Sequence, residues 1–356
     1  MFLKVVFRLG CCNADMRNPK TAILTMSGAA MLLAGVVLAA NAPGYAPGTR
    51  TIILSHNAYP DHGQYTDRLD RAIAVGVPFA TEQDLAWVDG KSLMIHGAKN
   101  VSGEDPTLDS YFIPRVRPLI EKALKEGNKG NWPLVILYLD IKNDPPEHLE
   151  AISQWLDKYD SWLTTAVKTP DISKQSPLDL KPMMVLVEDK QNDIKQQYFY
   201  DKVPVGGKIR VFGSVTKFDE NPSKLPRERK AEAVASLVSF DPEQLVPHKA
   251  DNYHRWFGTN WAFVEKGGET GAGEWTRASE ARLKKFVDYG HRLGYFVGFY
   301  CLDGYSEAEN KGWDKDYNFG SKEKVMPRWQ AAARSHADFI STDQMEEVAQ
   351  ILKATH

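Results

Sequence analysis

Short apolar runs alternate with longer helical patterns along most of this 356-residue chain. Eight runs have the length and the β-branched and aromatic content of strands. They cover residues 51–55, 79–85, 134–140, 183–188, 209–215, 256–263, 296–301 and 337–341. Helical patterns separate most of them, at 66–75, 109–126, 147–167, 227–237, 276–293 and 327–336. Strands separated by helices predict parallel βαβ units, and eight units in roughly 250–315 residues have the size of a (β/α)₈ barrel. We therefore predict an α/β protein with one domain, a TIM barrel over residues 43–356.

The N-terminal segment does not fit the barrel pattern. Residues 22–40 carry no charge, follow Arg17 and Lys20, and lead into the small residues 40–42. A basic start, an apolar middle and a small-residue end are typical of a secretory signal peptide, which we assign to residues 1–42. The apolar run is also long enough to span a bilayer, so a membrane anchor remains an alternative, and a buried core helix is a third. We expect an exported protein, either periplasmic or secreted.

Composition narrows the classes of function. The chain has 44 Lys+Arg against 46 Asp+Glu, a formal net charge of −2, so no general attraction to nucleic acid is expected and we predict no nucleic-acid partner. Two of the three cysteines, Cys11 and Cys12, lie in the leader and leave only Cys301 in the barrel. The barrel can therefore form no intramolecular disulfide and no cysteine-based zinc site. A metal there would be bound by histidine and carboxylates.

Carboxylates occur where two neighbouring strands of the predicted barrel end. Glu82 and Asp84 are two residues apart and so point to the same face, and Asp140 ends the next strand. Catalytic groups of such barrels lie at the carboxyl ends of the strands. Three converging carboxylates suit one hard divalent cation, Mg²⁺ or Ca²⁺. Each acidic group alone would also fit a helix cap or a solvated turn.

Titratable and cationic side chains accompany these carboxylates. His56 follows the first strand, His96 follows a short apolar run at 92–95, and Lys142 follows Asp140 by two residues. Two imidazoles are natural general acid and base groups near neutral pH. A cation, a lysine and two histidines together suit displacement at phosphorus. Separately, each histidine could be a structural hydrogen-bonding group, and Lys142 could simply pair with Asp140.

The order of these residues resembles a known superfamily. His56-Asn57, Glu82-x-Asp84, His96 and Asp140-x-Lys142 follow one another as in the phospholipase-C-like phosphodiesterases. That group includes glycerophosphodiester phosphodiesterases, sphingomyelinase D toxins and phosphatidylinositol-specific phospholipases C. The resemblance covers both ends of the mature chain and leaves about 150–255 unmatched.

The resemblance implies a role for each matching residue. His56 and His96 would be the acid/base pair, Glu82, Asp84 and Asp140 the metal ligands, and Lys142 a phosphate contact. We add Asn57 and Tyr300 as candidate substrate contacts. Tyr300 ends the seventh strand, where related enzymes often place a tryptophan beside the pocket, although a core aromatic there needs no function.

Two departures leave the subfamily open. Glycerophosphodiesterases usually have Arg after the first His and a Pro-Glu-Asn-Thr motif, whereas this chain has Asn57 and no such motif. They commonly use Glu as the third metal ligand; Asp140 favours the toxin-like branch, whose disulfides this barrel cannot form.

The sequence thus predicts an exported, metal-dependent phosphodiesterase that cleaves a glycerophosphodiester or (lyso)phospholipid head group. The resemblance leaves open a cyclic phosphate intermediate, and sphingomyelinase D-like or phosphatidylinositol phospholipase C-like activity. A non-catalytic phosphate- or lipid-binding barrel and a metal-assisted hydrolase of sugars or amides are the alternatives from other classes. The expected partner is a phosphodiester or phospholipid, peripheral membrane contact is compatible with it, and the oligomeric state is open.

Overall fold

A computed structural model describes residues 45–99, 101–188, 194–215, 227–266, 271–300, 302–309, 311 and 318–355. The predicted leader at 1–42, whether signal peptide or membrane anchor, lies outside these described residues. Cys301 also lies outside them. Export of the protein therefore stays a prediction. Among the described residues no helix is long and apolar enough to cross a membrane.

Eight parallel strands of the described chain close into a barrel, which confirms the predicted (β/α)₈ fold. Each strand pairs with the next one along the chain, and β1 pairs with both β2 and β12, so the sheet has no open end. The strands are nearly all buried apolar segments, as expected when both faces of a parallel sheet are covered. They are β1 (Ile52–Ser55), β2 (Phe79–Val88), β4 (Val135–Ile141), β7 (Met183–Val187), β9 (Val211–Ser214), β10 (His254–Asn260), β11 (Phe296–Tyr300) and β12 (Phe339–Thr342).

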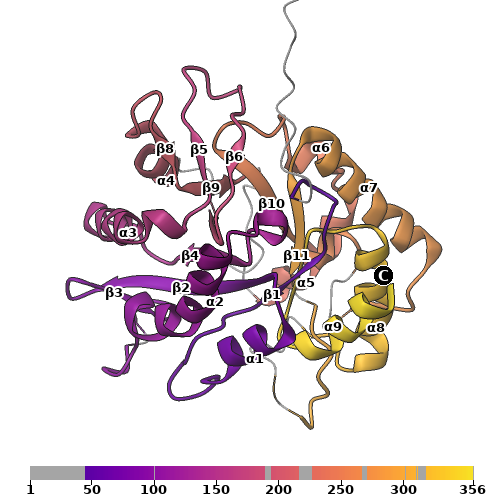
Figure 1. Cartoon of the computed structure of the whole chain (residues 1–356). Coiled ribbons are helices and arrows are strands. Elements are labelled where there is room, and N and C mark those ends of the chain that lie inside the picture. The colour runs from indigo at the N-terminus through magenta and orange to yellow at the C-terminus, as the bar shows by residue number, and fades with distance from the viewer. Residues whose placement is uncertain are drawn as a thin grey trace, which may run out of the picture. The chain divides into compact units, whose positions relative to one another are not determined.

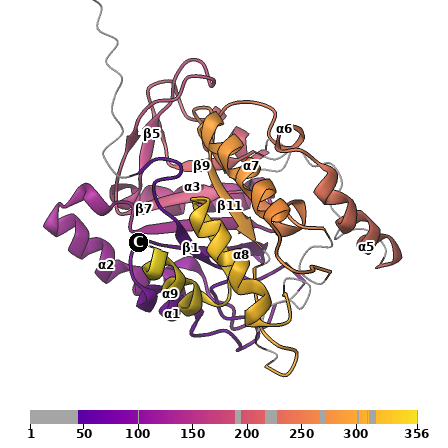
Figure 2. The same ribbon diagram turned by 90° about the vertical axis from the view of Figure 1, so that its right-hand side faces the viewer.

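Helices cover the outside of the strands (Figure 1). Among them, α7, α8 and α9 run beside one another along the C-terminal part of the barrel (Figure 2). Gly290 of α7 shows how closely a helix approaches, because a Cβ atom there would lie 2.5 Å from both Phe257 and Val297. The helices are α1 (Arg68–Val75), α2 (Ile113–Glu126), α3 (Pro146–Lys158), α4 (Ile194–Gln196), α5 (Arg227–Ser236), α6 (Pro242–Leu245), α7 (Arg277–Leu293), α8 (Lys322–Arg334) and α9 (Met345–Thr355).

Several element boundaries differ from the sequence prediction. The helix predicted over 147–167 ends at Lys158, and the chain enters strand β5 (Thr165–Val167), where β-branched residues favour extended backbone. A second, three-stranded sheet with the order β6-β5-β8 contains it, together with β6 (Leu178–Asp179) and β8 (Lys208–Ile209). Helix α8 begins at Lys322 rather than 327, because Ser321 caps it by accepting a hydrogen bond from the Lys324 amide. Helix α9 is an addition that the sequence did not predict.

A hairpin extends β2 beyond the barrel. Strand β3 (Lys91–Met94) pairs with β2 in antiparallel register, with Val88 opposite Lys91. The two linking residues, Asp89 and Gly90, both have positive φ, at 48° and 77°, which suits a tight two-residue turn. The returning strand brings His96 back beside Asp84, in the middle of β2.

Candidate active site

Three carboxylates meet at the carboxyl end of the barrel. Glu82 and Asp84 lie on β2, and Asp140 of β4 is the register partner of Asp84. One oxygen from each residue lies within 4.8 Å of the others. Asp84 has no solvent exposure and Glu82 only 9%. The structure therefore brings the three predicted ligands together.

Burial makes this cluster electrostatically costly on its own. It raises the pKa of Glu82 well above the usual range, and Asp84 and Asp140 raise it further. Burial and then the charge of Asp140 raise the pKa of Asp84 to about 7. Positive charge beside the cluster is therefore needed to keep all three carboxylates ionised at neutral pH.

Lys142 supplies part of that charge. Its Nζ atom lies 2.7 Å from Asp140 Oδ2 and 3.1 Å from Asp84 Oδ2. Burial opposes the charge on Lys142, but Asp140 and Asp84 outweigh this effect and raise its pKa. Lys142 thus stays protonated, and the pairing with Asp140 that the sequence left open is present.

The remaining contacts of the cluster fit a divalent cation. Tyr59 donates a hydrogen bond to Asp84 Oδ2 at 2.8 Å, whereas Asp84 Oδ1 is buried and accepts none within the described structure. Three ionised carboxylates and one lysine leave two net negative charges. An unsatisfied buried oxygen, that net charge and an all-oxygen donor set together suit Mg²⁺ or Ca²⁺.

His96 lies at the open side of the carboxylates. Its Nε2 atom is 3.9 Å from Asp84 Oδ2, and half of its side chain is exposed. Burial, the charge of Lys142 and, more weakly, that of His56 lower the pKa of His96, while Asp140 acts in the opposite direction. His96 therefore lies beside the carboxylates, and His56, which directly follows β1, lies at the same end of the barrel.

His56 is held in position by Asp343, the residue that follows the last strand. Ser55 and Thr342 are register partners, so the residues that follow them, His56 and Asp343, lie next to each other. His56 Nδ1 is 3.2 Å from Asp343 Oδ1, and Asp343 is 1% exposed. An ionised carboxylate can only accept, so Nδ1 carries the proton and Nε2 presents a lone pair when the ring is neutral.

Arg68 of α1 fixes Asp343 in turn. Its two terminal nitrogens lie 2.6 and 2.9 Å from the two oxygens of Asp343, and Nη1 also donates to the His56 carbonyl at 3.1 Å. His56, Asp303 and Asp343 have ligand atoms close enough for a metal. The bidentate arginine already neutralises Asp343, so a hydrogen-bonded network explains this second cluster better than a cation does.

Asp303 gives this network a pH dependence that can be measured. Burial and then Asp343 raise the pKa of Asp303 well above its usual range, although its Oδ1 accepts from Thr342 Oγ1 and from the Asp343 amide, both at 2.7 Å. Because the folded protein binds the proton of Asp303 more tightly than the unfolded chain does, this proton stabilises the fold. The stabilisation is complete below about pH 4, the pKa of an aspartate in the unfolded chain, and is lost as the pH rises through the pKa of Asp303 in the folded protein.

We expect Asp303→Asn to lose less stability than the wild type between about pH 5 and pH 8, because asparagine keeps an accepting oxygen and cannot titrate. The free energy of unfolding in urea, measured across that range, checks this. Equal pH slopes for the two proteins would contradict it.

The two candidate substrate contacts stay predictions. Asn57 is 2% exposed and has a φ of 43° in the turn after β1, where its carbonyl accepts from the Tyr59 amide at 2.9 Å. Tyr300 ends β11 opposite Asn260 and is 38% exposed. The structure therefore places Tyr300 where a ligand could reach it and encloses Asn57.

Sequence reasoning missed Tyr59, Arg68, Asp303 and Asp343. Asp343 directly follows the eighth strand, so the strand-end argument that found Asp140 could have found it. Arg68 lies 275 residues from Asp343 on a helix, and no spacing rule connects the two.

Comparison with known proteins assigns the chain to no family. No family model matches the chain, and no curated protein matches its sequence. Among solved structures, the phosphatidylinositol-specific phospholipase C of Listeria monocytogenes is 11% identical with a TM-score of 0.39, over 87% of this chain and 94% of that one. A Plasmodium falciparum HPPK-DHPS variant with pterin and p-hydrobenzoate is 12% identical with a TM-score of 0.40, over 87% of this chain and 48% of that one.

The chain thus spans about half the length of the HPPK-DHPS chains it matches. The two matched proteins have different names, and similarity at this level carries no information about the activity of this chain. The function has to be inferred from the site.

Proposed function

We propose that this protein is a phosphoric diester hydrolase that works with one divalent cation. The observation that carries the proposal is the meeting, at one end of the barrel, of two histidines with a lysine and a buried carboxylate cluster. His56 is fixed by Asp343, and His96 and Lys142 lie within 3.9 and 3.1 Å of the same oxygen, Asp84 Oδ2. Base, acid and anion-binding charge are the groups that phosphodiester cleavage requires.

The chain's own residues have distinct roles in this proposal. One imidazole removes the proton from the attacking hydroxyl, and the other protonates the leaving oxygen. His56 suits the first role because its Nδ1 atom is held by Asp343, which leaves the lone pair of Nε2 to accept a proton. His96 suits the second role because its pKa is lowered, which makes its protonated ring the stronger acid. Lys142 contributes positive charge beside the phosphate oxygens. A cation held by Glu82, Asp84 and Asp140 would add charge stabilisation at the same place.

The substrate class in this proposal comes from the sequence resemblance. A glycerophosphodiester or a (lyso)phospholipid head group agrees with the order of the site residues, and peripheral contact with a membrane would accompany a lipid substrate. Attack by a hydroxyl of the substrate would give a cyclic phosphate, whereas attack by water would give the monoester directly. Phosphorus NMR of the early products of glycerophosphodiesters, lysophospholipids, sphingomyelin and phosphatidylinositol distinguishes these routes and substrates.

Removal of the cation should abolish turnover. We expect excess EDTA to eliminate cleavage of a phosphodiester substrate and Mg²⁺ or Ca²⁺ to restore it, because the proposed ligands are all carboxylates. Asp84→Asn should raise the cation concentration needed for half-maximal activity by more than about 10-fold, since it removes one ligand charge. Asp89→Asn, at the tip of the same β2–β3 hairpin, is the matched control and should leave that concentration unchanged. Full activity in excess chelator would remove the cation from the mechanism.

A further inference from the structure

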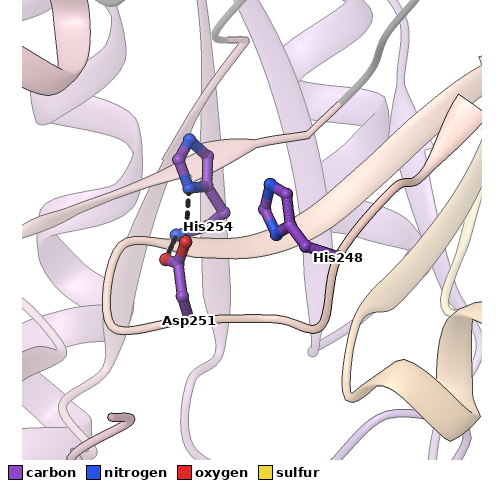
Figure 3. Close-up of side chains that lie close together, drawn as sticks. All are labelled: His248, Asp251 and His254. Carbon is purple, nitrogen blue, oxygen red and sulfur yellow. Dashed lines mark hydrogen bonds and ion pairs between the residues drawn. The ribbon is translucent and has the colours of Figure 1, made fainter. Parts of the chain in front are cut away.

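Two histidines and an aspartate that the sequence left without a role gather on one loop. His248 and Asp251 lie on the loop that joins α6 to β10, and His254 follows at the same interval of three residues, where the loop enters β10. Because His254 is the first residue of β10, this loop lies at the amino end of the strands, opposite the candidate active site. One ligand atom from each of the three side chains lies within 4.8 Å of the others (Figure 3).

The aspartate is oriented by the turn that it stabilises. Asp251 Oδ1 accepts from the amides of Tyr253 and His254 at 2.8 and 2.6 Å, and the Asp251 amide donates to the His254 carbonyl at 3.0 Å. These contacts leave Oδ2 directed at His254 Nδ1, 2.8 Å away.

His248 has the outer contact that metal-binding histidines usually have. Its Nδ1 atom lies 2.9 Å from the Lys249 carbonyl, which can only accept, so the ring proton resides on Nδ1 and Nε2 carries a lone pair. The Tyr295 hydroxyl lies 3.2 Å from the same Nδ1 atom. His248 is exposed at the surface, so an ion and a completing water can reach it.

An ordinary ion pair explains only part of this arrangement. The contact between Asp251 and His254 alone would stabilise the turn, and it gives no reason for a second imidazole at the same point. The rings of His248 and His254 meet edge to face with centroids 5.8 Å apart, so two protonated rings would repel each other. Two neutral imidazoles and one carboxylate are a donor set typical of zinc.

We propose that His248, Asp251 and His254 bind one borderline divalent ion of the Zn²⁺ class, which replaces the proton between His254 Nδ1 and Asp251 Oδ2 and releases it to solvent, with water completing the coordination. Two ligands on one ion lie roughly 3.0–3.5 Å apart when each bond is about 2.1 Å. The three ligand atoms now lie within 4.8 Å of one another, so the ion has to draw them closer together. The ion ties the loop to the first residue of β10, so it stabilises the barrel and takes no part in phosphodiester cleavage. The inference is independent of the proposed function.

Zinc binding by single-site variants tests the proposal. The full chain without an affinity tag is titrated with Zn²⁺ by calorimetry, and with Co²⁺ while the visible absorption of imidazole-bound cobalt is recorded. With excess Mg²⁺ present to occupy the carboxylate cluster, we expect one binding event that weakens at least about 100-fold in both His248→Ala and His254→Gln and that persists in Asp84→Asn. The melting temperature of the wild type should rise by several degrees in excess Zn²⁺, and that of His248→Ala should not.

His336→Asn is the matched control. His336 is an exposed histidine in the loop before β12, at the same end of the barrel, and its φ of 57° is one that asparagine tolerates. This variant should bind Zn²⁺ as the wild type does. Because His248 is exposed, its replacement does not threaten folding, and circular dichroism confirms this. An unchanged isotherm in His248→Ala and His254→Gln, or a binding event lost only in Asp84→Asn, would overturn the proposal.

Discussion

Replacing either His56 or His96 by alanine is expected to lower kcat by about 10²–10⁴-fold, the usual contribution of a positioned proton-transfer group. Substrate affinity should change much less, because Lys142 and the carboxylate cluster remain. The two losses should not multiply in the double variant, since both imidazoles serve one transition state. Steady-state kinetics on the phosphodiester that the wild type cleaves best give these values.

The pH dependence of kcat/KM tests the same acid/base assignment. The wild type should show a bell-shaped profile of kcat/KM, which reports one neutral and one protonated imidazole as a coupled pair. Because the pKa of His96 is lowered, the limb that belongs to it should fall below pH 6.5, the usual value for histidine. His96→Ala should remove that limb.

His62→Asn is the control for both measurements. His62 lies six residues after His56 on the same loop, its side chain is half exposed, and its φ of 46° suits asparagine. Its turnover should equal that of the wild type. A single variant of His56 or His96 that keeps near wild-type turnover with an intact fold would rule out the acid/base assignment.

Replacing Arg68 by methionine should destabilise the barrel by about 3–5 kcal/mol, as expected when one partner of a buried charge pair is removed. Arg68 is 2% exposed and contacts both oxygens of Asp343, which in turn lies beside the buried Asp303. Methionine fills much of the volume of the arginine stem, so the loss arises mainly from the uncompensated carboxylate of Asp343. The urea concentration at the midpoint of unfolding measures the effect.

Arg71 provides a matched comparison on the same helix. It pairs with Glu346 at 2.7 Å, but 32% of the Arg71 side chain and 44% of the Glu346 side chain are exposed. An exposed pair of this kind contributes only about 0–1 kcal/mol. Arg71→Met should therefore unfold close to the wild-type midpoint. Equal destabilisation by the two replacements would show that burial of Asp343 does not set the size of the effect.

The barrel itself could be predicted from the sequence because its signal is local. Each parallel strand is buried on both faces, so it appears as a short apolar run, and each covering helix shows its own periodicity. Closure between β1 and β12 then follows from the number of units. Among the elements that were missed, β5, β6 and β8 are two or three residues long and form a sheet beside the barrel, which leaves too short a pattern to detect.

The carboxylate cluster was predictable for a related reason. Side chains alternate along a strand, and neighbouring parallel strands end at the same edge, so Glu82, Asp84 and Asp140 had to converge once their strands were identified. The β2–β3 hairpin that returns His96 to this edge depends on the turn residues Asp89 and Gly90, which are also local in the sequence.

Only the tertiary structure decided how His56 is held. Asp343 approaches His56 because the last strand pairs with the first, and Arg68 does so because α1 packs beside β1 and α9. These two partners of His56 are 287 and 12 residues away along the chain. The loop that gathers His248, Asp251 and His254 depends in the same way on the turn made by Asp251 and on the neighbouring Tyr295. Periodicity determines which face of an element is buried, whereas the polar contacts that orient a histidine depend on which distant segments meet, and that is decided when the barrel closes.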